Sequence, residues 1–257
     1  MASELHDGAA PALGVLRFRG GDTRKFLQGQ LSNDVSLLAP DRVLLAGMHN
    51  PQGRVLALLR LVAPAADEVI ALLPAELAEP TMTALRRFVL RAKVTISAES
   101  SSAALSALRQ QLPLIAPLLA PGARSAHIAA GVPQVYGATS GLFVAQMLNL
   151  DCVEAISFTK GCYTGQEIIA RAHYRGRMKR RMQRFESARA ARLLPGQGVT
   201  LGDGRAAQIV DAVVRGDGRS EFLAVAPLPA GASAPAEEHA GERLACQPLP
   251  LPYALPE

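Results

Sequence analysis

The segment Ile156–Gly176, ISFTKGCYTGQEIIARAHYRG, holds the most unusual arrangement of residues in the chain. Within it, KGCYTGQE (160–167) places a single cysteine, Cys162, between Gly161 and Gly165. Two glycines this close permit a tight turn with positive φ and a close approach of the backbone to a ligand. The QEIIARAHY that follows is a good helix former. The sequence therefore predicts a loop that carries a thiol just ahead of a helix N-terminus.

The predicted surroundings of Cys162 favour a thiolate. Gln166 and Glu167 would occupy the first turn of the helix, at the positive end of its dipole. Lys160 precedes the cysteine by two residues. A positive helix end and a nearby ammonium both stabilise a thiolate, so we predict a reactive, at least partly accessible Cys162. The alternative is a small buried apolar side chain, as most free cysteines are.

The three cysteines, Cys152, Cys162 and Cys246, form no CxxC pair and no disulfide framework. Their spacing matches no zinc or iron–sulfur ligand set, so we expect no bound metal. Free thiols persist in a reducing compartment, which predicts a cytoplasmic protein. No uncharged apolar run reaches the ~20 residues of a membrane span, and the N-terminus lacks the apolar centre of a secretory signal. We therefore expect no membrane association.

Positive charge is concentrated in one run. The chain of 257 residues carries a net charge of +5. Seven Lys or Arg and no acid fall between Arg171 and Arg184, so acids outnumber bases in the remainder. With Tyr163 and Tyr174 nearby, such a run can hold phosphates and stack on planar rings, which indicates an anionic partner such as a polyglutamate tail, RNA or an acidic protein. The alternative is a plain solvated face.

The pattern of apolar residues predicts two regions. Before residue 184 we expect helices mixed with strands: strands at 15–19, 54–63, 68–73 and 93–96, and helices at 23–30, 81–91 and around 103–112, with 140–150 partly helical. Asp22 and Thr81 are the expected N-caps of the first two helices. Past residue 184, strand-like pieces alternate with Gly-rich turns at 182–186, 198–201, 206–214 and 221–226, typical of a small β-barrel or sandwich. A low-complexity loop is expected at 226–236.

These motifs together resemble the YgfZ family of folate-binding proteins, relatives of the glycine-cleavage T-protein, which is an aminomethyltransferase. KGCYTGQE resembles the family signature. The other similar segments follow in order: FLQGQLSNDVS (26–36), LRRFVLRAKVTI (85–96), GVPQV (131–135), SGLFVAQMLNL (140–150) and QPLPLPY (247–253). The resemblance covers most of the chain.

The resemblance implies an α+β fold, with T-protein-like subdomains around a central folate-binding hole and a small C-terminal β-barrel. We expect a loose N-terminal tail over 1–12, a folate-binding α+β region over 13–184 that carries the cysteine loop, and a barrel-like domain over 185–257. Residues 97–124 are short against the family, so the middle subdomain is expected to be shortened.

The resemblance also implies a function. Family members bind tetrahydrofolate and support the assembly or repair of iron–sulfur enzymes and, through them, tRNA modification by methylthiolation. Iron–sulfur client or assembly proteins would be the partners, and tRNA a further one through the basic run. Cys162 matches the family's key thiol, and the rest of the signature is matched by Lys160, Gly161, Tyr163, Gly165, Gln166 and Glu167. The candidate folate contacts are Asn33, Asp34, Arg171, Tyr174 and Arg175.

Two other functions stay open. One is a tetrahydrofolate-dependent one-carbon transferase with Cys162 in the chemistry. It is disfavoured because Ala129 stands where the family often has a glutamate. The other is an RNA-binding module that uses the run 171–184. For Asn33 and Asp34 the alternative is a plain turn that ends a helix.

Overall fold

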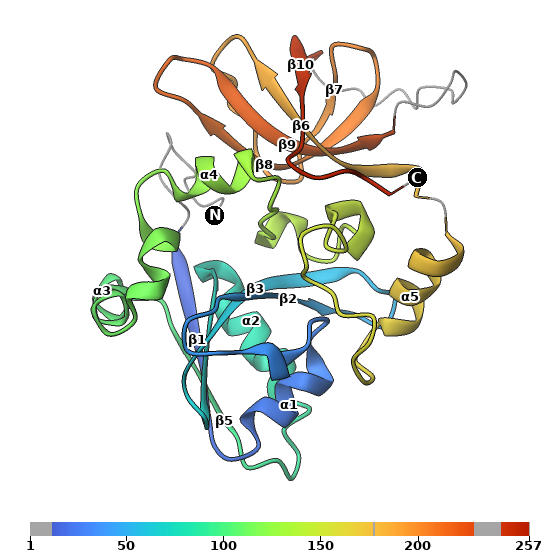
Figure 1. Ribbon diagram of the computed structural model, residues 1–257. Helices are drawn as coiled ribbons and strands as arrows, with labels where there is room; N and C mark the ends of the chain where they lie inside the picture. Colours follow the sequence, from blue (N-terminus) through green and yellow to red (C-terminus); the bar gives the residue numbers. More distant parts are fainter. Residues whose placement is uncertain (1–11, 177, 229–242, 257) are drawn as a thin grey trace.

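Two five-stranded antiparallel sheets organise the protein in the computed structural model, which describes residues 12–176, 178–228 and 243–256 (Figure 1). The tail expected over 1–12 and the loop expected over 226–236 lie mostly outside these residues. The first sheet has the strand order β2 (Leu44–His49), β3 (Val55–Ala65), β4 (Glu68–Pro74), β1 (Leu13–Arg19) and β5 (Thr95–Glu99). The second has the order β10 (Cys246–Leu249), β6 (Arg180–Ser187), β9 (Ser220–Pro227), β8 (Ala206–Val214) and β7 (Gly198–Thr200).

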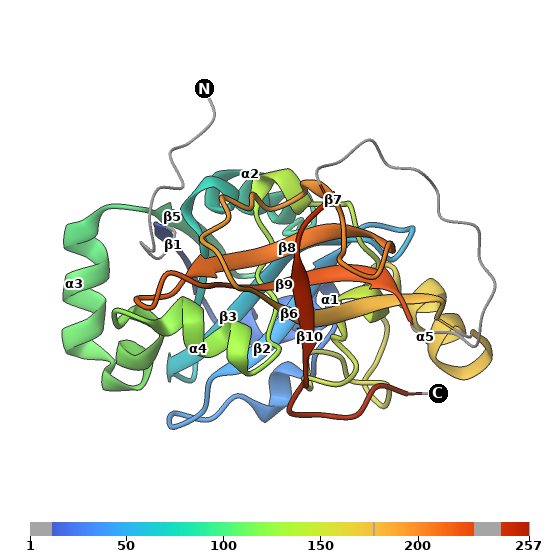
Figure 2. The ribbon, with the colours of Figure 1, turned by 90° about the horizontal axis from the view of Figure 1, so that it is seen from above.

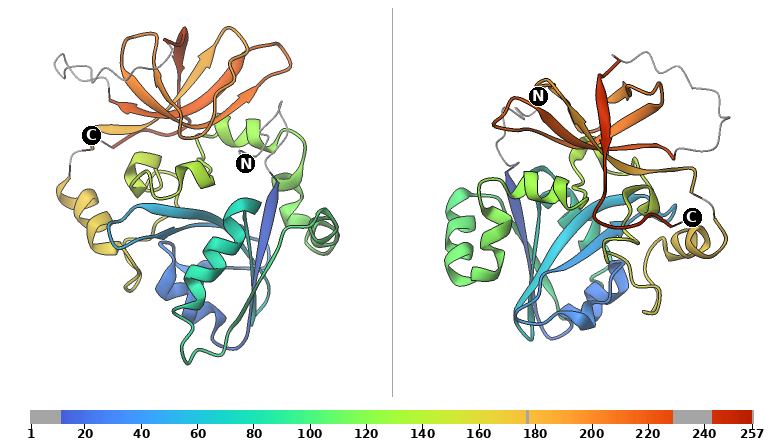
Figure 3. Two further views of the ribbon diagram at one scale, coloured as in Figure 1. Left: turned by 180° about the vertical axis from the view of Figure 1, so that it is seen from behind. Right: turned by 45° about the horizontal axis from the view of Figure 1, so that its top comes forward.

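Helices surround and connect the sheets. The α-helices are α1 (Thr23–Gln30), α2 (Ala75–Arg86), α3 (Ser102–Gln111), α4 (Ala123–Ala129) and α5 (Gln166–Arg175). Short 3-10 helices are η1 (Val35–Leu37), η2 (Pro113–Leu119), η3 (Gly137–Thr139) and η4 (Ala145–Leu148). In two opposite views α1 and α2 lie on one side of the first sheet and the second sheet lies on the other (Figures 1 and 3). The predicted α+β fold is confirmed. No helix in the described part of the chain is long and apolar enough to cross a membrane.

The second sheet closes on itself. The backbone N–H of Leu244 donates to Thr200 O at 2.8 Å, and Thr200 pairs with Arg243 in a parallel bridge. Edge strand β7 therefore meets the segment that enters the other edge strand, β10. Closure leaves few unpaired edge groups, and it agrees with the expected small C-terminal barrel. The boundary expected after residue 184 falls inside β6.

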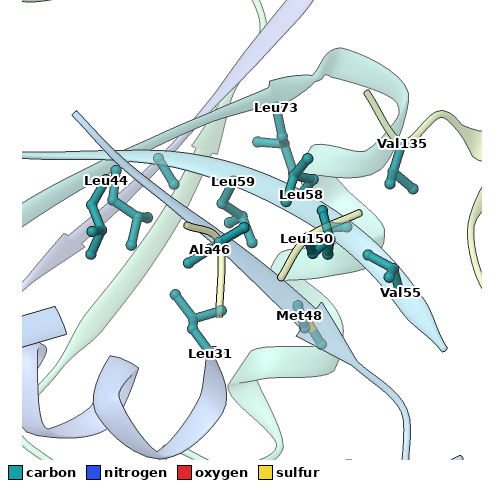
Figure 4. Close-up of a cluster of buried hydrophobic side chains, with 14 of the residues drawn as sticks. Leu31, Leu44, Ala46, Met48, Val55, Leu58, Leu59, Leu73, Val135 and Leu150 are labelled. Atoms are coloured by element: carbon teal, nitrogen blue, oxygen red, sulfur yellow. The ribbon is translucent and has the colours of Figure 1, made fainter. Parts of the chain in front are cut away.

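One hydrophobic core joins the two sheets. It includes Leu59 of β3, Phe26 and Leu27 of α1, and Leu223 and Val225 of β9. Figure 4 shows the part around β2 and β3, where side chains from both strands meet those of the connecting segments. Burying each large apolar side chain contributes about 1.5–3 kcal/mol. The sheets share this burial, and a view from above shows the strands of the second sheet lying across the first (Figure 2).

Helix α2 differs from its prediction. The helix expected over 81–91 in fact begins at Ala75, so Thr81 lies buried inside it, as does Pro80, rather than at an N-cap. Packing against β1 explains this, because a Cβ on Gly14 would meet Ala78 Cβ at 2.9 Å. Pro80 removes one backbone hydrogen bond from α2. The burial of the apolar side chains of α2, which the close contact at Gly14 permits, stabilises the helix by more than this loss.

Asp22 stands at the N-cap position of α1, as predicted, but its side chain does not serve as the cap. Asp22 makes no side-chain hydrogen bond to its own helix. Its carboxylate instead accepts from the backbone N–H of Lys93 at 2.7 Å. Asp22 thereby ties the start of α1 to the segment that enters β5.

Candidate functional site

The signature loop rests on the turn between β2 and β3. Gly165 precedes α5 with φ +83°, and a Cβ there would lie 2.5 Å from Asn50 O and 3.2 Å from Gly53 Cα. Gly53 has φ +72°, and Ile168 packs where its Cβ would be, at 3.1 Å. Backbone thus lies directly on backbone, which only glycine permits at these positions. The predicted helix after the loop is confirmed, and its start is fixed by this contact.

Lys160 anchors the other end of the loop. Its ammonium donates to Gln28 O and Leu31 O, both at 2.6 Å, and to Asn33 O at 3.0 Å. These carbonyls lie at the C-terminal end of α1, where a cation complements the helix dipole. Burial lowers the pKa of Lys160 to about 8. All three N–H donors of the ammonium are used here, so none is left to stabilise a thiolate at Cys162.

Tyr163 fills the space beneath the loop. Its buried ring lies 5.2 Å from the ammonium of Lys160 and 6.2 Å from the ring of His49. Burial raises the pKa of Tyr163 to about 12 and lowers that of His49 to about 3. Both rings are therefore neutral near pH 7. The loop is thus held by Tyr163 beneath it, by the hydrogen bonds of Lys160 at one end, and by the close backbone packing of Gly165 at the other.

Cys162 lies on the outer side of this anchored loop and is exposed. Gly161 beside it is open, because a Cβ there would meet no heavy atom of the described residues within 4 Å. Cys152 and Cys246 are partly buried, and burial raises the pKa of both thiols, that of Cys152 to about 11. The predicted accessibility of Cys162 is confirmed, and its reactivity stays a prediction.

We expect iodoacetamide to label Cys162 of the native protein at least about tenfold faster than Cys152, because the thiolate is the nucleophile. With a pKa of about 11, Cys152 is ionised in well under about 0.1% of molecules at pH 7.5. Its labelling rate should keep rising as the pH is raised toward 11. Mass spectrometry of time-resolved digests measures each site separately. Equal rates for the two cysteines would contradict this prediction, and a denatured sample provides the control for intrinsic reactivity.

Helix α5 carries an exposed face that begins at the loop. Arg171, Tyr174 and Arg175 are all exposed, Tyr174 by 69%. His173 stacks on Phe158 with ring centroids 3.8 Å apart, and Tyr174 packs edge-on against both rings. This aromatic cluster attaches the last turn of α5 to the segment before the signature. The face is therefore positively charged and held in place.

The basic run does not form one patch. Arg181 makes a buried ion pair with Asp151 at 2.9 Å, and Arg184 pairs with Glu221 at 2.7 Å. Arg177 lies outside the described residues. The cations of the run that the structure shows as exposed are Arg171, Arg175 and Lys179. Internal ion pairs thus take up part of the charge that the sequence offered to a partner.

Asn33 and Asp34 lie next to the loop but serve the turn after α1. The Asn33 amide donates to Leu45 O at 2.7 Å and to Glu154 O at 2.6 Å. Asp34 accepts from Ser36, whose hydroxyl is the main cause of the lowered pKa of this carboxyl, and from Gln28. The structure brings both residues near Lys160, whose ammonium binds Asn33 O and acts on the Asp34 carboxylate. Folate contacts from either group stay a prediction.

A polar pocket between the two sheets was not predicted from the sequence. In it Arg124 of α4 pairs with Asp211 of β8 at 2.7 Å, and the Tyr136 hydroxyl donates to the same carboxylate at 3.0 Å. The cavity measures about 30 Å³ and is also lined by Arg60, His127 and Gln134. The sequence did carry a signal, since Arg60 and Asp211 are the single charged residues of β3 and β8. Among the described residues, no cluster of three or more His, Cys, Asp or Glu could hold a metal ion.

Comparison with known proteins finds relatives by sequence. No protein-family model matches the chain. It is 32% identical over 197 residues to an uncharacterized protein of Haemophilus influenzae, covering 67% of this chain and 70% of that protein. It is 30% identical over 214 residues to the tRNA-modifying protein YgfZ of Escherichia coli K12, covering 63% of this chain and 65% of that protein.

A solved structure has the same fold. The aminomethyltransferase T of the glycine cleavage system from Bartonella henselae superposes with a TM-score of 0.62 over 84% of this chain and 76% of that one, at 12% identity. At this identity the likeness shows the fold alone. The predicted T-protein-like architecture is confirmed.

Proposed function

Since the chain belongs to the YgfZ family, we propose that it is a folate-binding accessory protein. In this proposal it supports the assembly or repair of iron–sulfur enzymes and, through them, the methylthiolation of tRNA. Cys162 is its key functional thiol. The aligned segment spans just under two thirds of the E. coli relative, so activity and partners rest on the proposal and on its test.

The observation that carries the proposal is the exposed thiol on a loop anchored at both ends. Lys160 fixes one side to α1 and Gly165 fixes the other to the β2–β3 turn. Cys162 thus stands at a defined position just ahead of the positive end of α5, which favours a thiolate. One thiolate cannot hold a cluster alone. The thiol would contact the iron or sulfur of a cargo cluster transiently, with the other ligands supplied by the partner protein.

Folate binding is proposed because of the relation to the family. Tetrahydrofolate has a bicyclic pterin and an anionic glutamate tail. The polar pocket at the junction of the sheets measures about 30 Å³, far below the roughly 300–1,000 Å³ of a typical pocket for an organic ligand. A pterin does not fit this pocket as it stands, so no step of the proposed mechanism passes through it. The predicted contacts Arg171, Tyr174 and Arg175 offer the glutamate tail charge and an aromatic face at the surface instead.

The one-carbon transferase finds less support. Asp211 is the one acid among the described residues that line the pocket, and Arg124 and Tyr136 already hold its carboxylate. A general acid or base must lie within hydrogen-bond reach of the proton that it moves, and these two contacts already occupy the carboxylate. Ala129, where the family often has a glutamate, is partly buried in α4 and supplies none.

RNA binding is the second candidate, favoured by the exposed face of α5. Arg171 and Arg175 can contact phosphates and Tyr174 can stack on a base. No internal ion pair is recorded for either arginine among the described residues, so both charges are open to a partner.

Complementation in the host tests the proposal. The gene is deleted and restored as wild type, Cys162→Ser, the matched control Cys246→Ser, or the double variant Arg171→Ala/Arg175→Ala. The readouts are the methylthio-modified fraction of tRNA, by mass spectrometry, and the activity of one [4Fe–4S] dehydratase. We expect Cys162→Ser to lose at least about 90% of both at equal protein level, because no other exposed thiol can replace it. The cysteine control should restore both.

Two results would change the assignment. Full restoration by Cys162→Ser would make the thiol structural. If the arginine double variant alone fails, and tRNA binding by the pure protein falls steeply with salt, the RNA-binding function replaces the thiol-based one.

A further inference from the structure

The polar pocket lies where β3, α4 and β8 meet, away from the signature loop. Arg60 comes from β3 and Gln134 from the segment before η3, and both side chains line the cavity of about 30 Å³. Helix α4 lies against the second sheet on the other side (Figure 1). Three parts of the fold thus enclose one small polar space.

Two buried N–H groups in this pocket have no partner. Arg60 is only 5% exposed, and its Nη1 donates to Oε1 of Gln134. Within the described part of the chain, Nη2 of Arg60 and Nε2 of Gln134 find no acceptor. Buried donors are normally satisfied, because an unpaired one forfeits its hydration. These two donors belong to side chains that already contact each other, so one acceptor group could satisfy both.

The pocket also holds an unbalanced positive charge. Burial lowers the pKa of Arg60 to about 10, which leaves its guanidinium charged at pH 7. The charge of Arg124 is matched by its ion pair with Asp211. His127 has its pKa lowered to about 4, mainly by burial, and is therefore neutral. Arg60 makes no ion pair of its own with a carboxylate of the described residues, and Asp211, the acid that acts on it at longer range, is already paired with Arg124. A buried charge of this kind calls for a counter-ion.

We propose that this pocket is a binding site for a small oxyanion, a carboxylate or a phosphate group, held by Nη2 of Arg60 and Nε2 of Gln134. Guanidinium and oxyanion are complementary in charge and in hydrogen-bond geometry. The cavity has room for a group of a few atoms and no more. The inference goes beyond the proposed function, because it needs neither the thiol nor a pterin.

Thermal unfolding of the full chain tests this site. A ligand that binds only the native state raises Tm with its concentration. We expect phosphate or acetate to raise the Tm of wild type above that in chloride of equal ionic strength and pH. Arg60→Met should weaken the apparent affinity for the anion at least about tenfold, since the charged donor is gone. Arg91→Met, at an exposed arginine, is the matched control and should keep the full response.

A second variant, Gln134→Glu, replaces the bound anion with a carboxylate of the protein itself. Gln134→Glu keeps the size of the side chain and places a carboxylate against Arg60. It should raise Tm in chloride alone and abolish the response to phosphate and acetate. The proposal is overturned if wild type responds to neither anion beyond chloride, or if Arg60→Met responds as wild type does.

One further titration separates a free anion from the acidic end of a larger ligand. Tetrahydrofolate binding is measured by calorimetry with and without saturating phosphate. Competition in wild type assigns the pocket to the carboxylate end of folate, and independent binding assigns it to a free oxyanion. Either result is compatible with an oxyanion site in the pocket. The Tm test does not depend on folate, so a protein that binds no folate would fail the proposed function without changing the result for this site.

Discussion

Replacing Gly165 by alanine is expected to destabilise the protein by about 2–4 kcal/mol. The residue has φ +83°, a region in which an L side chain costs about 1–2 kcal/mol. The added Cβ would also lie 2.5 Å from Asn50 O. That oxygen cannot move freely, because it accepts from the N–H of Gly53 at 2.9 Å within the β2–β3 turn. Two backbone segments would have to separate, and α5 would lose its docking.

Gly161→Ala is the matched control for this prediction. It lies in the same loop, but its added Cβ meets no described heavy atom within 4 Å and its φ is not positive. We expect a change within about 0.5 kcal/mol. Urea denaturation of both variants measures the free energy of unfolding. Equal effects at the two glycines would show that contact with the turn does not hold the loop.

The second large effect is expected from Lys160→Met, which we predict to cost about 2–4 kcal/mol. Methionine keeps most of the volume of lysine but removes the ammonium that binds Gln28 O, Leu31 O and Asn33 O. Carbonyls at the end of α1 would lose their charged donor in a buried place. Hydrogen bonds to a charged group typically contribute more than those between neutral groups, and the cost of burying the ammonium offsets part of this contribution.

Hydrogen exchange locates the effect of Lys160→Met. Exchange should accelerate in residues 160–166 and 28–35, which the ammonium joins, and remain unchanged in the barrel. Lys179→Met, at an exposed lysine, is the control and should change the free energy of unfolding by less than about 0.5 kcal/mol. A stable Lys160→Met variant with native exchange in both segments would exclude the anchoring role.

Both predictions divide the signature into a scaffold and a working group. Lys160, Tyr163 and Gly165 build and anchor the loop, and each of them contacts a segment far away in sequence. Cys162 contributes nothing visible to this anchoring and stands exposed. A side chain with no packing role in a strongly constrained loop is the one most readily explained by chemistry.

The sequence alone determined the local features of the protein, namely single helices, strands and loops. The glycines and helix formers of the signature predicted α5, and the strand pattern predicted β8 with the bounds that the structure shows. Both depend on preferences that act over a few neighbouring residues. The accessible thiol belongs here too, since it follows from the loop ahead of the helix.

Tertiary structure alone decided what depends on distant partners. Lys160 reaches carbonyls 127 to 132 residues away in sequence, so its role as an anchor could not be predicted from its neighbours. Helix α2 begins at Ala75 because Gly14 of β1 admits Ala78. Arg181 and Arg184 of the basic run pair with acids elsewhere in the chain. Arg60 of β3 meets Gln134, 74 residues away in sequence, only in the folded chain. Such contacts arise when burial aligns whole elements, and no local propensity encodes that alignment.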